Sequence, residues 1–71
     1  MKKKCAEQIV KILLECSASL NNSISIVKLN SDKDETEKYR RMVGKIMGLI
    51  LIEFLNPTFQ KFPELKPDDF D

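Results

Sequence analysis

The apolar run of residues 42–55, MVGKIMGLILIEFL, constrains the fold more than any other feature of the sequence. Only Lys45 and Glu53 interrupt it. A membrane-spanning helix needs about 20 predominantly apolar residues, so the run is too short and too charged to predict a span. It is typical of the second half of a long helix that is buried on more than one side. Such a helix needs more than one neighbour.

The chain has 71 residues, which corresponds to one small domain. A chain of this size buries only about 60% of its unfolded surface, and its core rarely supplies more than ~3–5 kcal/mol. Disulfides, a metal or oligomerisation usually make up the difference. The sequence has no His and only two Cys, which predicts no metal site and no cofactor. We therefore expect the chain to self-associate.

Residues 4–21 have the pattern of an amphipathic helix. Apolar residues recur along it at spacings of three and four: Cys5, Ala6, Ile9, Ile12, Leu13, Cys16 and Leu20. The two cysteines lie about 16 Å apart along such a helix, too far for a disulfide. The pattern predicts that both pack in the core as small apolar side chains. Asn21 and Asn22 are expected to end the helix, since Asn tolerates the left-handed conformation of a C-cap.

Residues 23–31, SISIVKLNS, are β-prone, and two interpretations stay open. They form either an extended connector that tucks against the helices or a strand that pairs with its copy in a dimer. A second helix over residues 33–55 follows, with Asp32 as N-cap, Glu35 as its capping-box partner and Ser31 as a competing cap. The Asn56–Pro57 pair is expected to end this helix and to allow a short helical turn after it.

The predicted second helix has two apolar faces. The first would pack on the helix of residues 4–21 and consists of Tyr39, Met42, Val43, Ile46, Ile50 and Phe54. The second consists of Gly44, Gly48, Leu51, Ile52 and Leu55. Its glycines are four apart, a spacing that lets another backbone come close. We expect this glycine face to be a homodimer interface, so that two all-α hairpins form a four-helix bundle. The alternative is that the chain's own tail covers it.

The domain is expected to span residues 1–71, with residues 57–71 as a C-terminal arm. In this arm, apolar side chains alternate with proline and polar residues, as in short docking peptides. The candidate partner-docking residues are Phe59, Phe62, Leu65 and Phe70. The alternative is an arm that caps its own bundle.

Two clusters of basic residues suggest a different partner. They consist of Lys2, Lys3 and Lys4, and of Lys38, Arg40 and Arg41. A net charge of only +1 argues against strong steering towards nucleic acid. A dimeric nucleic-acid-associated regulator that uses both clusters is nevertheless the alternative function.

Catalytic patterns are missing from the sequence, which has no Cys–His pair, no Ser–His–Asp set and no phosphate-binding glycine loop. Glu7, Gln8 and Lys11 interrupt any apolar segment of a signal peptide, and two cysteines without secretory features fit a reducing compartment. We therefore expect a cytoplasmic, non-enzymatic protein-interaction module, either an adaptor, a chaperone or an assembly factor. It would act as a helical dimer on a protein partner and not on a membrane.

Overall fold

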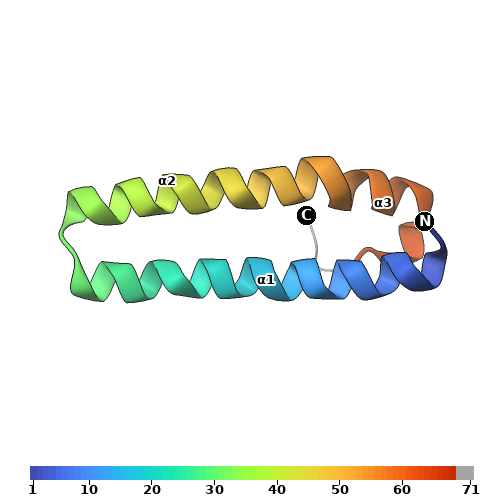
Figure 1. The fold of residues 1–71 in the computed structure, drawn as a ribbon, viewed down its shortest axis with the longest axis horizontal. Helices are drawn as coiled ribbons and strands as arrows, with labels where there is room; N and C mark the ends of the chain where they lie inside the picture. The colour runs from blue at the N-terminus through green and yellow to red at the C-terminus, as the bar shows by residue number, and fades with distance from the viewer. Residues whose placement is uncertain (69–71) are drawn as a thin grey trace.

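The computed structural model describes residues 1–68 and consists of two long antiparallel helical arms joined by a tight turn (Figure 1). The elements are α1 (Lys3–Asn30), α2 (Lys33–Ile50), the π-helical turn η1 (Leu51–Leu55), α3 (Asn56–Lys61) and the 3-10 turn η2 (Pro63–Leu65). No strand occurs among these residues. The predicted all-α hairpin is confirmed, and it forms a flat layer of 44 × 20 × 16 Å.

Helix α1 is longer than the sequence pattern predicted. It continues through Asn21 and Asn22 to Asn30, so the expected connector or strand over residues 23–31 is wrong. Ile24 and Val27 are half-buried in this last part of α1. Packing along α2 therefore outweighs the β propensity of the segment, as tertiary context commonly does.

The turn between the helices consists of Ser31 and Asp32, both with extended backbone. Asp32 is the N-cap of α2, as predicted, because its Oδ1 accepts a hydrogen bond of 2.8 Å from the backbone N–H of Glu35. Its carbonyl oxygen also accepts from the Thr36 hydroxyl at 2.8 Å. The first bond satisfies a backbone donor that a helix start otherwise leaves unpaired.

The second arm does not end at the Asn56–Pro57 pair, so the predicted helix end is wrong, whereas the predicted short helical turn after the pair is present as α3. A proline inside an α-helix lacks an N–H and clashes with the carbonyl four residues before it. Here Leu51–Leu55 widens into a π-helical turn, and the Asn56 N–H donates to the Leu51 carbonyl five residues back. Pro57 then lies in the first turn of α3, where no N–H is needed. The helical path continues to Lys61.

The π turn decides which side chains face α1. Regular helix turns by about 100° per residue, so Leu55 would be rotated by roughly 120° from Val43 on an uninterrupted α-helix. One extra residue in the π turn removes about one step of this rotation. Leu55 therefore comes into line with Val43, and both are buried, at 3% and 1% exposure.

The core is small and lies towards the end of the hairpin that holds the N-terminus. Val10, Leu55 and Phe59 form its centre, and partly buried residues pack around them: Leu13, Leu14, Ile50, Leu51, Phe54 and Leu65. Ala6 and Val43 are the other fully buried apolar residues in the described part of the chain. A single layer of two helices buries only the seam between them, which leaves both broad faces uncovered.

Candidate interaction surface

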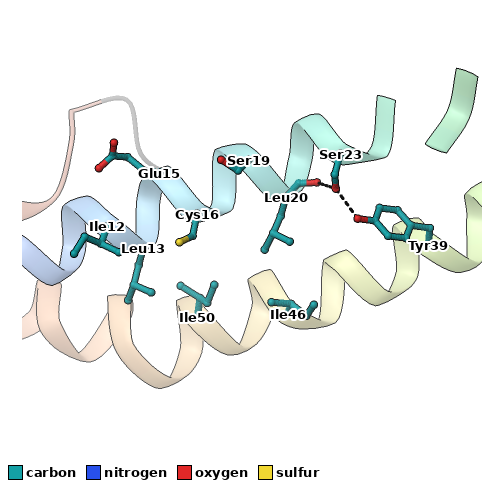
Figure 2. Close-up of a pocket in the computed structure, with 10 residues that line it drawn as sticks. All are labelled: Ile12, Leu13, Glu15, Cys16, Ser19, Leu20, Ser23, Tyr39, Ile46 and Ile50. Carbon is teal, nitrogen blue, oxygen red and sulfur yellow. Dashed lines mark hydrogen bonds between the residues drawn. The ribbon is translucent and has the colours of Figure 1, made fainter. Parts of the chain in front are cut away.

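A long apolar groove runs between α1 and α2 on one broad face of the hairpin (Figure 2). Its volume is about 690 Å³. The apolar lining comes from both arms and consists of Ile12, Leu13, Cys16 and Leu20 on α1 and Ile46 and Ile50 on α2. Glu15 is the one charged residue in the lining. We call this the open groove.

A hydrogen bond between the two helices lies at the end of the open groove nearer the turn. The Ser23 hydroxyl donates to the Leu20 carbonyl at 2.5 Å, and its oxygen is 2.7 Å from the Tyr39 hydroxyl (Figure 2). A hydroxyl has one hydrogen, so Tyr39 is the donor in the bond to Ser23. This bond ties α1 to α2 where the lining changes from apolar to polar.

Large apolar side chains also border the open groove and point away from the hairpin core. Ile12 is 52% exposed, and Met42 is 46% exposed. Met42 lies three residues after Tyr39 and four before Ile46, so it shares their side of α2. The groove and its apolar border therefore form one continuous face, to which both helices contribute apolar side chains.

The opposite face of the hairpin carries a smaller groove of about 250 Å³. It is lined by Leu14, Ser17, Met47, Gly48, Leu51 and Leu55, and we call it the glycine groove. Nothing lies within 4 Å of the place that a Cβ atom would take on Gly44 or Gly48. The predicted dimer residues therefore divide: Gly44 and Ile52 are exposed, Gly48 and Leu51 are half-buried, and Leu55 is buried in the hairpin's own core.

The glycine groove does not continue as an apolar surface towards the turn. There the next groove is lined by Lys28, Ser31, Lys33, Thr36, Glu37 and Arg40. Arg40 and Met47 are seven residues apart, so this charged groove and the glycine groove lie on the same side of α2. The glycine side is therefore apolar over only part of its length.

Both cysteines are exposed, so the prediction that they pack in the core is wrong. Helix α1 has a broad apolar stripe, and it turns the side with Ala6 and Val10 towards the second arm. Cys16 lies beside that contact and lines the open groove. The apolar pattern had included these residues but did not indicate which edge of the stripe would be covered.

The tail packs on its own hairpin. Phe59 is buried at 7% exposure, and Leu65 packs against the same core. Phe62 is half-buried, with the Lys61 ammonium 5.4 Å from the centre of its ring. Phe59 and Leu65 are thus occupied within the chain and not displayed for a partner, while Phe70 lies outside the described residues.

The two basic clusters lie at opposite ends of the molecule, since α1 begins where the second arm ends (Figure 1). Lys3 pairs with Glu64 at 2.9 Å, and Arg40 pairs with Glu37 at 3.0 Å. The hydrogen bond from Lys3 holds the pKa of the Glu64 carboxyl below its ordinary value. The fold does not combine the clusters into one basic surface.

The helical run Lys33–Lys61 is long and apolar enough to cross a membrane, judged by length and composition alone. An 18-residue window in it has a mean hydropathy of 1.4, and 17% of that window is buried. The apolar run was expected to be too short for a span because a helix end was expected at residue 55, whereas the helical path continues to Lys61. A single such helix is weak support for a span, because core helices and signal sequences share these properties. Most of this apolar window is nevertheless uncovered in one copy of the chain.

Among residues 1–68, no group of three or more Cys, Asp or Glu residues is placed to hold a metal ion. No protein-family model, no curated protein and no solved structure matches the chain. The grooves are therefore the features from which a function has to be argued. The sequence pattern indicated the glycine side but not the open groove. The feature of the sequence that could have indicated the open groove is the unusual width of the apolar stripe on α1.

Proposed function

We propose that this protein is a small non-enzymatic interaction module, an adaptor, chaperone or assembly factor, that works as a homodimer of helical hairpins. The observation that carries the proposal is the surface that one copy leaves uncovered. Apolar side chains are exposed along both arms, including Ile12, Met42, Leu49 and Ile52. Large contiguous apolar surfaces on a folded chain are typical of protein or membrane contact sites.

The amount of surface matches what a second copy would cover. One copy exposes 5632 Å², whereas a compact monomer of 8.2 kDa is expected to expose about 4,500 Å². The excess of roughly 1,100 Å² is of the same order as the ~800 Å² that each partner buries in a standard dimer. The radius of gyration is 14.4 Å, against about 11 Å for a compact domain of this length. Stacking two flat hairpins into a four-helix bundle would cover part of the excess exposed area and would give a particle that is more compact for its number of residues.

Charge argues for a protein partner over a lipid bilayer. Lys45 and Glu53 are exposed within the apolar half of the second arm. Insertion experiments assign about 2.5–3.5 kcal/mol to a Lys or Asp at the centre of a membrane helix, so two charges in one span are a substantial cost. In a dimer, both can stay in water at the edge of the bundle.

The nucleic-acid alternative has less support. A protein that binds a nucleic-acid backbone usually gathers its Lys and Arg side chains on one face. Here the two clusters lie at the two ends of a layer that is 44 Å long, and Lys3 and Arg40 already have acidic partners.

Sedimentation equilibrium of the full chain over a wide range of concentration tests the proposal. We expect the mass to rise from that of one copy to that of two, with a melting temperature that increases with protein concentration. A monomer at every concentration would refute it. Two parallel assays address the other classes. Flotation with neutral and anionic phospholipid vesicles would reveal membrane binding, and duplex binding that falls steeply with added salt would reveal nucleic-acid binding.

A further inference from the structure

We infer that the second copy packs on the open groove and not on the glycine face that the sequence indicated. This inference rests on the proposed homodimer and specifies its interface. It assigns Ile12, Cys16, Leu20, Met42 and Ile46 to the buried surface of the dimer, and it leaves Gly44 and Gly48 on the outside of the four-helix bundle.

Size is the first reason. The open groove has a volume of about 690 Å³, against about 250 Å³ for the glycine groove. Two hairpins pack well when the ridges of one layer enter the hollow between the helices of the other. A larger hollow accepts more side chains and buries more apolar area. Burial of apolar area is the main favourable contribution to association.

Polarity is the second reason. Most residues that line the open groove are apolar, and Glu15 is the one charged residue among them. On the glycine side, the surface nearer the turn presents Lys28, Lys33, Glu37 and Arg40. A dimer that covered the whole glycine side would have to remove these charges from water, which costs free energy unless each finds a partner. The lining of the open groove contains no such cluster of charges.

The third reason concerns the two glycines. Small residues favour a close helix crossing when another backbone sits against them. Within one copy, nothing approaches the Cβ position of Gly44 or Gly48 within 4 Å, so neither glycine is required by the hairpin's own packing. Leu55, which the sequence assigned to the glycine interface, is directed into the hairpin's own core by the π turn and is only 3% exposed, so it presents little surface to a partner on this face.

Two methionines on α2 provide a matched test. Met42 is 46% exposed, and its spacing places it on the side of α2 that carries Tyr39 and Ile46 of the open groove. Met47 lines the glycine groove. Met42→Glu and Met47→Glu make the same chemical change on the same helix but on opposite faces. Sedimentation equilibrium should show that Met42→Glu weakens association by roughly 100-fold or more, since each copy would bury an unpaired carboxylate. Met47→Glu should change the dissociation constant by less than about 3-fold, because its carboxylate would lie on the outside of the bundle, away from the interface.

Circular dichroism must show that both variants keep the helicity of the parent chain. The reverse order of effects would overturn the inference and leave the homodimer intact. Equal dissociation by both variants would also overturn it. A parent chain that is monomeric throughout would refute the proposed function itself. These outcomes separate a wrong interface from a wrong function.

The Cys16 thiol gives a second measurement that needs no disruptive variant. In a Cys5→Ser protein, Cys16 is the one remaining thiol, and it lies in the open groove. We expect a thiol reagent to label it at least about 10-fold more slowly at concentrations where the dimer forms, because the interface excludes the reagent. A labelling rate that does not change with protein concentration, while sedimentation shows dimer, would place the partner elsewhere and overturn the inference.

Discussion

Replacing Gly44 and Gly48 by Ala tests the outer position assigned to the glycine face. Both glycines lie inside α2, where Gly is less favourable than Ala by about 1 kcal/mol per residue. A Cβ atom at either position meets no atom within 4 Å, so no steric cost opposes the gain. The double variant should therefore raise the free energy of unfolding by roughly 2 kcal/mol. For a chain of this size, each kcal/mol corresponds to about 4–8 °C in melting temperature.

The assay is thermal unfolding by circular dichroism at two protein concentrations, together with sedimentation equilibrium. Gly48→Leu is a sharper variant, because Leu forms helix well but overpacking at a close crossing typically costs about 1–3 kcal/mol. We expect stability to rise or hold in all these variants while association is unchanged. Loss of stability together with weaker association would show that the glycines sit at a helix crossing, and our argument for the open groove would fail.

Three further predictions concern the hairpin itself. Phe59→Ala should destabilise the fold by about 3–5 kcal/mol, which is close to the total stability expected for so small a core. The half-buried Phe62 should tolerate replacement by Ala better. Urea unfolding measures both variants, and equal effects would contradict the assigned core. Asp32→Ala should lower the free energy of unfolding by about 1 kcal/mol through loss of the N-cap, while Asp32→Asn should retain most of the stability. An unchanged urea midpoint for Asp32→Ala would contradict the role of Asp32 as N-cap. The pKa of Glu64 is lowered by Lys3, so this pair stabilises the fold above the ordinary carboxyl pKa and the contribution is lost as the pH falls through the lowered value. Glu64→Gln should therefore flatten the acid side of the stability–pH curve slightly, and a difference that persists at the lowest pH would refute this assignment.

Several features of the fold could be read from local sequence. The apolar spacing in residues 4–20 and 39–54 predicted two helices, because helix periodicity is a property of the chain itself. Asp32 followed three residues later by Glu35 predicted where α2 begins, because capping involves only neighbouring residues.

Other features depended on contacts between the two arms. The segment of residues 23–31 is β-prone by composition, yet it becomes helix beside α2, where Ser23 bonds to Tyr39. The second arm covers one edge of the broad apolar stripe on α1, and Cys16 on the other edge stays exposed. Periodicity alone does not determine which edge of a broad stripe is covered.

The sequence by itself determined the helical class, the two arms and the cap at Asp32, since these follow from interactions within one or two turns. Pro57 in the sequence indicates an interruption of the helix, but only the tertiary structure shows that the interruption is a π turn through which the helical path continues. The π turn accommodates Pro57 and at the same time rotates Leu55 and Phe59 onto α1, where they form the core. That rotation removed Leu55 from the predicted glycine interface and left the open groove as the larger uncovered surface. One extra residue in a helical turn redirects every later side chain by about 100°. Burial of Leu55 and Phe59 against α1 compensates for the less favourable geometry of the π turn. The spacing of apolar residues in the sequence does not predict that burial.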